Sequence, residues 1–292
     1  MRTVILHYHI YKNAGTSFDH VLSHSFGDRH EVFDGPYPFF VIDQEQLDRT
    51  IMRRPGAVAF SSHQIVLPPP SSVDYRTLSA IFLRNPFLRI ASVYRFKRGP
   101  ETGDGTPVAA LPPEAQPAAL RALNLPEELA AQIDVTSTGV AARHLDFADW
   151  LDHCLGSPAE IGNVSNAQVR FFSSPYRMRP AQRRTATGME YDLGTALRTL
   201  SGVELLGRTE HFDADVARFA RILDQDHAIT LSIPPDTRKN VTEAPRAPTP
   251  QRVEALLSSL PAGLRRRFEA ANAQDLALYE RACALIESDH RP

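Results

Sequence analysis

Residues 4–26 read VILHYHIYKNAGTSFDHVLSHSF, and this stretch decides the fold. The apolar, β-prone residues 4–10 predict a buried strand, and apolar residues recur over 18–26 at the spacing of one helix face. Between them lies a small polar loop, residues 12–17, with the sequence KNAGTS. The pattern therefore predicts a strand, a tight loop and a helix at the start of the chain.

The loop has the composition of an anion-binding site. In a strand–loop–helix unit the backbone N–H groups of the loop and the helix N-terminus converge, and both favour negative charge. Lys12 adds a mobile positive charge, and Thr16 and Ser17 add hydroxyl donors. The chain has only two other lysines, Lys97 and Lys239, so a lysine in this loop stands out from a surface charged with arginine. We expect the loop to hold a phosphate-like group.

Two familiar phosphate-binding loops do not fit this sequence. A P-loop nucleotide hydrolase needs glycine, four residues and then Gly-Lys-Ser/Thr, whereas here Lys12 precedes Gly15, Thr16 and Ser17. A dinucleotide-binding loop needs three spaced glycines, and this loop has Gly15 alone. What remains is a loop that presents a lysine on its strand side.

The rest of the chain alternates strand and helix patterns. This alternation predicts an α/β protein with a central, mainly parallel sheet flanked by helices. Strands are expected at 57–61, 78–83 and 203–206, and helices from 86, at 147–155, 213–223, 252–260 and 264–286. Trp150 is expected in the core. We predict one domain over 1–292, with a C-terminal helical part at 251–288.

Residues 99–131 differ in composition from the segments around them. They are rich in Pro, Ala, Gly and Glu and show no strand pattern. We expect an insertion or lid with one or two short helices, or a solvated loop without function. Residues 236–250 carry several prolines and are expected to form an ordered surface loop.

Composition excludes several classes of protein. A chain of 292 residues with 42% hydrophobic content can bury a sizeable core, and a net charge of -2 excludes a strongly basic nucleic-acid surface. Cys154 and Cys283 are far apart and lack metal-ligand spacing, which favours two reduced thiols. No apolar run approaches a membrane span, and the chain begins directly in a strand pattern. These features predict a soluble, cytoplasmic protein.

Two segments resemble a known family. Residues 9–17, HIYKNAGTS, look like the 5′-phosphosulfate motif of PAPS-dependent sulfotransferases. The closest variant is the HIPKTGGTS form of the carbohydrate, heparan sulfate 2-O-sulfotransferase-like branch. Residues 83–94, LRNPFLRIASVY, are similar to the family's 3′-phosphate motif, LRDPxxRxxSxY. Weaker similarities follow at 166–172, 206–210 and 239–242.

Three positions depart from the family pattern. Tyr11 stands where the family often has proline, Ala14 where it has the first glycine, and Asn85 where it has aspartate. None of these changes removes a charged donor. The Cβ of Ala14 is expected to tighten the loop or to alter its φ.

The resemblance implies a P-loop-like three-layer fold and sulfuryl transfer from PAPS to a hydroxyl acceptor. The acceptor would be a carbohydrate or glycoconjugate, PAP would be released, and no metal is implied. Lys12 would also stabilise the leaving group, where one such donor contributes roughly 3–4 kcal/mol. The residues that the resemblance assigns to PAPS are Lys12, Asn13, Ala14, Gly15, Thr16 and Ser17 at the 5′ end, and Arg84 and Ser92 at the 3′-phosphate. For Arg84, the alternative to binding the 3′-phosphate is a structural salt bridge.

The same resemblance suggests a catalytic base. The related branch uses a histidine at a strand end after the first helix, and His63 has a matching context. Imidazole suits this role because its pKa lies near neutrality. His9 and Glu210 are alternatives.

A group of arginines suits either an acidic glycan or a solvated face: Arg170, Arg177, Arg179, Arg183 and Arg184.

Two other functions stay open at this point. One is a P-loop-type kinase that uses ATP, and the other is a PAP-binding protein without turnover. An animal Golgi enzyme of this branch would carry a membrane anchor. The start at Met1, directly before a strand, therefore favours a soluble bacterial enzyme over an excised catalytic domain.

Overall fold

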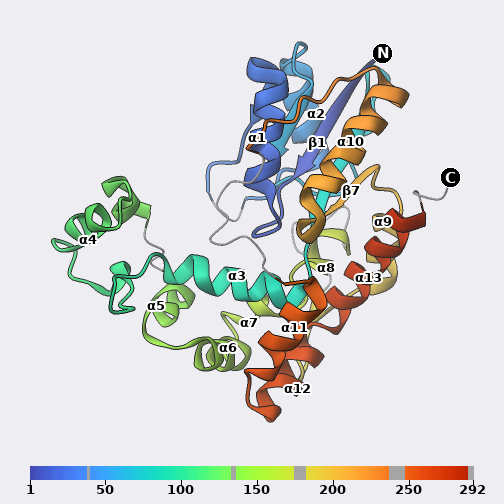
Figure 1. Cartoon of the computed structure of the whole chain (residues 1–292). Helices are drawn as coiled ribbons and strands as arrows, with labels where there is room; N and C mark the ends of the chain where they lie inside the picture. The colour runs from blue at the N-terminus through green and yellow to red at the C-terminus, as the bar shows by residue number, and fades with distance from the viewer. Residues whose placement is uncertain (38–39, 133–135, 174–181, 237–246, 289–292) are drawn as a thin grey trace.

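The computed structural model describes all residues except 38–39, 133–135, 174–181, 237–246 and 289–292 (Figure 1). Its centre is a sheet of five strands in the order β2-β3-β1-β4-β7, and every neighbouring pair is parallel. The first strand therefore lies in the middle of the sheet. The strands are β1 (Arg2–Tyr8), β2 (His30–Val32), β3 (Ala59–Ser62), β4 (Tyr75–Leu83) and β7 (Leu205–Arg208).

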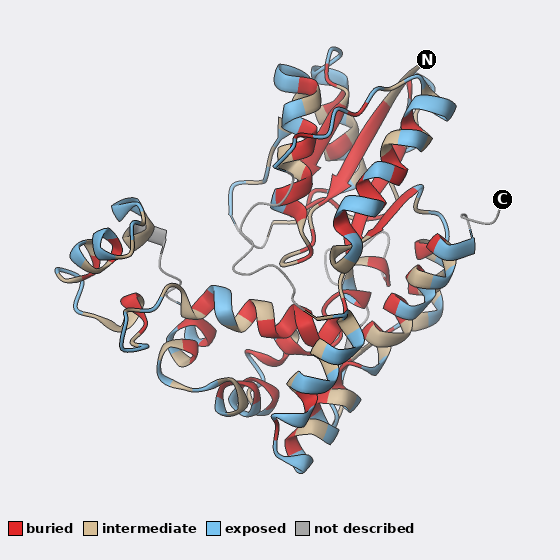
Figure 2. Cartoon of the chain, viewed as in Figure 1, coloured by how far each residue is buried: buried red, intermediate tan, exposed pale blue. Residues whose placement is uncertain are grey.

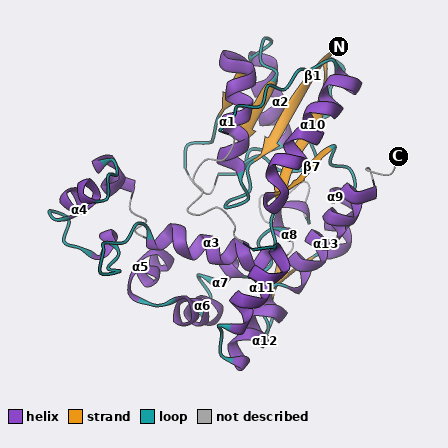
Figure 3. Ribbon diagram, in the orientation of Figure 1, coloured by secondary structure: helices purple, strands orange, loops and turns teal. Residues whose placement is uncertain are grey.

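Helices cover both faces of this sheet, so the α/β prediction is confirmed (Figure 3). One face packs on α1 (Gly15–Phe26) and α10 (Phe212–His227). The other face packs on α2 (Gln44–Arg53), α8 (Val169–Phe172), α9 (Leu193–Leu200) and α13 (Ala273–Ser288). The strands are the most continuously buried part of this layered unit (Figure 2).

A helical part adjoins the carboxyl-terminal edge of the sheet (Figure 1). Trp150 lies at its centre with none of its surface exposed, as expected from the sequence. Its helices are α3 (Pro86–Arg98), α5 (Ser137–His144), α6 (Phe147–Gly156), α7 (Ile161–Val164), α11 (Thr249–Ser258) and α12 (Ala262–Ala271). A small antiparallel hairpin pairs β5 (Gln182–Arg184) with β6 (Met189–Tyr191).

The insertion at 99–131 projects away from the rest of the molecule (Figure 1). It contains α4 (Gln116–Ala122) and two 3₁₀ turns, Val108–Ala110 and Glu127–Gln132. The expectation of short helices here is confirmed.

Several elements went unpredicted, among them the edge strand β2, helices α2, α5 and α9, and the hairpin of β5 and β6. Strand β2 has only three residues, too few for a periodic pattern. Helix α2 does carry a readable start, because Asp43 and Gln46 form a capping box at its N-terminus.

The predicted C-terminal helix at 264–286 is wrong as a single element. It divides into α12 and α13 at Asn272, whose φ of -122° and ψ of 16° are not helical. The side-chain amide of Asn272 donates to the carbonyl oxygens of Phe268 and Val164, at 3.1 and 2.9 Å. These bonds end α12 and tie the break to α7, a long-range reason that local periodicity does not carry.

Some of the features predicted from the sequence lie outside the residues that the structure describes. The 239–242 similarity and Arg177 and Arg179 lie outside the described residues, as does most of the 236–250 loop. No helix in the described ranges combines the length and apolarity that a bilayer crossing requires.

Candidate active site

The first loop follows the end of β1, at the carboxyl edge of the sheet. Lys12 and Ala14 both have left-handed backbones, with φ of 64° and 63°. Non-glycine residues adopt this conformation at a cost of about 1 kcal/mol each, and such strain collects at functional sites. A left-handed residue followed by a helical turn aims successive N–H groups to one side, as in anion-binding nests. Ala14 thus has the left-handed backbone that a glycine adopts without steric cost, and the expected effect of its Cβ on φ stays a prediction.

Gly15 begins α1 because nothing larger fits there. A Cβ at this position would lie 1.9 Å from Cδ2 of His9. The imidazole of His9 therefore lies directly against the backbone at the start of the helix. Thr16 is exposed in the first turn, while Ser17 is buried.

Gln168 joins the first loop to Arg84. Its side-chain oxygen accepts from Nδ2 of Asn13 at 2.7 Å and from the backbone N–H of Arg84 at 3.0 Å. Its Nε2 donates to the carbonyl oxygen of Arg84 at 2.9 Å. Nδ2 of Asn13 also donates to the carbonyl oxygen of Phe82 at 2.9 Å. The Asn13 side chain, predicted as a PAPS ligand, is thus engaged in holding the loop on β4.

Arg84 brings the two predicted motifs together. It follows the last residue of β4, and its Nη1 donates to the carbonyl oxygen of Lys12 at 3.1 Å. Its Nε lies 3.8 Å from a carboxylate oxygen of Glu210, a separation that allows an ion pair and no hydrogen bond. This buried Nε has no hydrogen-bond partner. The guanidinium keeps unused donor capacity beside Lys12.

Positive charge accumulates around Arg84. Burial lowers its pKa to about 10, and although Glu210 raises that pKa, Arg95, Arg252 and Arg89 each lower it. Burial also lowers the pKa of Lys12 to about 8, with Arg84 and Arg95 contributing. Among the described residues, the buried carboxylate of Glu210 faces Arg84 and that of Asp275 faces Arg89, so the cations of this group outnumber these carboxylates. The surplus of positive charge suits a bound anion.

A pocket opens beside this surplus. Its wall includes Glu210, which forms the ion pair with Arg84. It also includes Arg252, which lowers the pKa of Arg84. The pocket is lined by Glu210, His211, Ala247, Pro248, Thr249, Pro250 and Arg252.

The face of α3 that carries Ser92 turns toward the first loop. Nε of Arg89 donates to the carbonyl oxygen of Tyr11 at 3.1 Å, and the ring of Phe96 meets that of Tyr11 edge-on. Ser92 lies three residues after Arg89 and four before Phe96, so it occupies the same helix face. Phe96, 55% exposed, also places its ring 4.3 Å from Nζ of Lys12.

The remaining motif departure has a structural role. The side chain of Asn85 caps α3 by accepting from the backbone N–H groups of Phe87 and Leu88. Asparagine and aspartate cap helices about equally well, so Asn85 preserves the helix start. Pro86 occupies the first turn, as expected.

Glu210, one candidate base, is built into the fold. Its side chain is 2% exposed. Its carboxylate accepts from the backbone N–H of Asn85 at 3.2 Å and from the hydroxyl of Tyr279 at 3.0 Å. These bonds and the facing Arg84 make it a counter-ion, and they disfavour a proton acceptor for an incoming hydroxyl.

His63 is exposed and has a defined tautomer. Its Nδ1 lies 2.9 Å from the carbonyl oxygen of His9, and an oxygen of this kind only accepts. In the neutral ring Nδ1 therefore carries the hydrogen, and Nε2 offers a lone pair. The backbone N–H of His63 donates to Asp34 at 2.9 Å. Although His63 is exposed as a whole, the partial burial of its ring and the nearby His9 lower its pKa, which favours this neutral form at pH 7.

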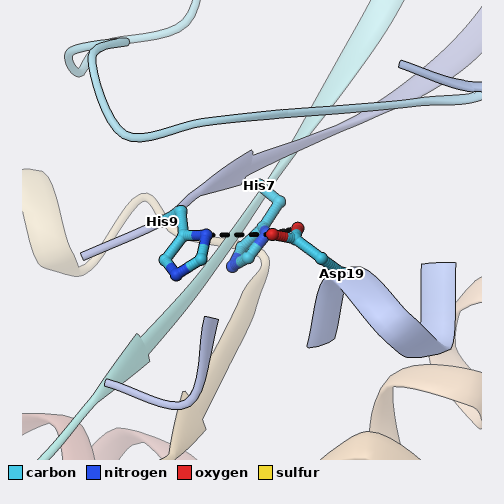
Figure 4. A group of neighbouring side chains, drawn as sticks. All are labelled: His7, His9 and Asp19. Atoms are coloured by element: carbon cyan, nitrogen blue, oxygen red, sulfur yellow. Dashed lines mark hydrogen bonds and ion pairs between the residues drawn. The ribbon is translucent and has the colours of Figure 1, made fainter. Parts of the chain in front are cut away.

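His9, the other candidate base, belongs to a hydrogen-bonded cluster with His7 and Asp19 (Figure 4). The Nδ1 atoms of His7 and His9 lie 2.7 and 2.9 Å from the two carboxylate oxygens of Asp19. The ligand atoms of these three residues lie within 4.8 Å of one another, which is close enough for a metal. Both Nδ1 atoms instead serve as donors to the carboxylate, so we interpret the group as a hydrogen-bonded cluster.

Reasoning from sequence missed Asp19, Arg95, Arg252 and Gln168. A signal existed for Asp19, because His7 lies in β1 and His9 immediately after its end, and a spacing of two residues favours the same side of an extended chain, here the side that α1 covers. Arg252 and Gln168 reach the site from distant segments. In the predicted arginine group, Arg170 and Arg184 are exposed and the side chain of Arg183 is not described.

Comparison with known proteins adds one distant relative. No protein-family model matches the chain. A protein of Archaeoglobus fulgidus, described as "Uncharacterized protein", is 23% identical over 290 residues, which cover 96% of this chain and 96% of that protein. The likeness extends over nearly the whole of both chains, and the printed description names no activity.

Proposed function

We propose that this protein is a sulfotransferase that moves a sulfuryl group from PAPS to a hydroxyl of a carbohydrate or glycoconjugate. The observation that carries the proposal is the 3.1 Å bond from Nη1 of Arg84 to the carbonyl oxygen of Lys12. Through this bond two loops 72 residues apart in the chain meet at one edge of the sheet. A ligand with two separate phosphate groups matches two adjoining cationic loops better than a single phosphate does.

The donor set fits such a ligand. The unpartnered Nε of Arg84 and the surplus of positive charge around it both call for an anion. Lys12 and the residues from Ala14 to Ser17 would hold the 5′-phosphosulfate, while Arg84 and Ser92 would hold the 3′-phosphate. Arg95 and Arg252 add charge on the same side.

The proposed reaction is an in-line displacement. PAPS supplies the activated sulfuryl group when bound. Nε2 of His63 would take the proton of the acceptor hydroxyl as its oxygen forms a new bond to sulfur. Lys12 would donate to the bridging oxygen as the bond from sulfur to that oxygen breaks and charge develops on the phosphate. Positioning and charge stabilisation are the main sources of rate in group transfers of this kind.

A thermal-shift experiment tests the ligand. The expected result is stabilisation by PAP without magnesium, reduced in Arg84→Ala and Ser92→Ala and retained in Ser201→Ala, a surface serine at the end of α9. Ser92→Ala keeps the test valid if Arg84→Ala does not fold. Stabilisation by Mg-ATP or NAD alone would overturn the proposal in favour of a kinase or a dehydrogenase.

A transfer assay tests the reaction. Wild-type protein with sulfur-labelled PAPS and a panel of glycans, glycolipids and small alcohols should yield a labelled acceptor and PAP in equal amounts. A His63→Ala variant should bind PAP as wild type does and lose turnover. Stabilisation by PAP with no product from any acceptor would replace the proposal with a PAP-binding protein.

A further inference from the structure

The ring of His63, the proposed base, packs against the ring of His9. The ring centroids of His63 and His9 are 3.8 Å apart, with 34° between the planes. His63 also donates to the backbone oxygen of His9. The position of His63 is therefore set by His9 through both its ring and its backbone.

His9 in turn touches the phosphate loop. The Cδ2–Nε2 edge of its ring lies where a Cβ on Gly15 would stand, at 1.9 and 2.2 Å. One imidazole thus fills the space between the residue proposed to take the proton and the backbone proposed to hold the phosphosulfate. Its thickness fixes the distance between the acceptor side and the donor side of the site.

Asp19 holds that imidazole in place. Its Oδ2 accepts from Nδ1 of His9, and its Oδ1 accepts from Nδ1 of His7. His7 is 1% exposed and further contacts Ser61 at 3.2 Å. With both oxygens engaged and one partner in the core, the carboxylate has little freedom, and this rigidity passes to His9.

We infer that Asp19 and His9 are positioning residues that set the separation and alignment of His63 relative to the loop from Lys12 to Ser17. This inference rests on the proposed function, since it concerns the base and the donor loop of that reaction. In-line transfer is sensitive to such spacing, and a misplacement of ~1 Å costs about 100-fold in rate.

The charges that face the two rings predict a measurable coupling. His63 faces His9, Asp34 and Asp19, and His9 faces Asp19, His7 and Asp34. The carboxylate of Asp19 raises the pKa of both rings, against the larger lowering caused by burial. Removing its charge should therefore lower the pKa of His63, a ring that Asp19 does not touch.

The test uses Asp19→Asn, which keeps the size of the side chain and removes its charge. We expect kcat to fall about tenfold or more, with the acid limb of the pH–rate profile at lower pH, while stabilisation by PAP stays. The matched control is Asp28→Asn, the same change at an exposed site in the 3₁₀ turn after α1. This control should leave both readouts unchanged.

A double-mutant cycle separates positioning from general weakening. The second variant is His9→Phe, which keeps a ring between Gly15 and His63 and loses the bond to Asp19. Because Asp19 acts through His9, the double variant should lose no more kcat than His9→Phe alone. Multiplied losses would overturn the inference, as would an Asp19→Asn variant with kcat within twofold of wild type.

Titration of His63 by NMR makes the test independent of turnover. A lower pKa of His63 in Asp19→Asn supports the coupling even if no acceptor yields a sulfated product, in which case only the proposed function fails. An unchanged titration of His63 in a folded Asp19→Asn variant overturns the coupling, whatever the activity.

Discussion

The two sides of the first loop differ in how their charges are balanced. On the side of Arg84, the cations outnumber the buried carboxylates of Glu210 and Asp275 that face them, and a guanidinium nitrogen lacks a hydrogen-bond partner. On the side of His63, the carboxylate of Asp19 accepts from the imidazoles of His7 and His9, and the ring of His9 stacks on that of His7 and contacts that of His63. The first side carries a surplus of positive charge, whereas the Nδ1 atoms and the carboxylate of the second are hydrogen-bonded to one another. The difference fits the proposal that the first side binds the anion and the second holds the base in position.

Lys12→Ala should break the binding side most severely. Loss of a donor to developing charge costs about 10²- to 10³-fold in kcat, so we expect a loss of that size in transfer from PAPS. Steady-state kinetics measure it. Arg49→Ala, which removes one positive charge from the exposed surface of α2, should leave kcat unchanged. Equal losses in the two variants would mean that net charge, and not the position of Lys12, matters.

Glu210→Gln should increase the surplus of positive charge on the side of Arg84, because it removes the counter-ion of that residue. Breaking a buried ion pair costs about 3 kcal/mol or more, so the ligand-free protein should unfold at a lower temperature. Binding of PAP should then restore more stability than it adds to wild type, because the anion replaces the lost charge. Calorimetry with and without PAP measures both. A smaller gain on PAP binding would contradict the charge surplus.

Gly15→Ala should disturb both sides at once. Its Cβ would meet the ring of His9, and overpacking of this kind costs about 1–3 kcal/mol. Chemical denaturation measures this loss of stability, and the kinetics should show a lower kcat. Gly162→Ala is the matched control, since nothing lies within 4 Å of a Cβ there. A stable, fully active Gly15→Ala variant would show that the ring moves freely.

The pH dependence of kcat/KM should have an alkaline limb set by Lys12 and an acid limb set by His63. Lys12 must be protonated to donate, and its pKa of about 8 places the alkaline limb of kcat/KM near pH 8. His63 must be neutral, and its lowered pKa places the acid limb below pH 6.5. In Phe96→Ala the amine gains solvent, so its pKa should rise and the alkaline limb should move upward by less than one pH unit. An unmoved limb would show that Phe96 does not shield the amine.

The local part of this architecture could be predicted from sequence. The strand, loop and helix at the N-terminus, the buried strand before Arg84 and the core position of Trp150 follow from periodicity and from short motifs. The predicted ends of the strands lie within a few residues of the observed ends. They differ because apolar runs do not mark where strand pairing stops.

The long-range part could not be predicted. The ion pair of Glu210 with Arg84 and the clamp by Gln168 depend on which distant loops meet at the sheet edge. The end of α12 depends on a bond from Asn272 to Val164. Only the two-residue spacing of His7 and His9, at the end of the first strand, gave a local hint of the cluster with Asp19.

The Gln168 clamp also ties the shape of the first loop to α13, which is made much later during synthesis. The backbone N–H groups of Gln168 and Val169 donate to Asp275 in α13, so residues 13, 84, 168 and 275 depend on one another. The N-terminal loop leaves the ribosome first, yet it gains its final shape only after the last helix has emerged. Contacts of such long sequence separation form late in folding. A nascent chain would therefore carry both motifs well before α13 is made, and the first loop would take its final shape only after that.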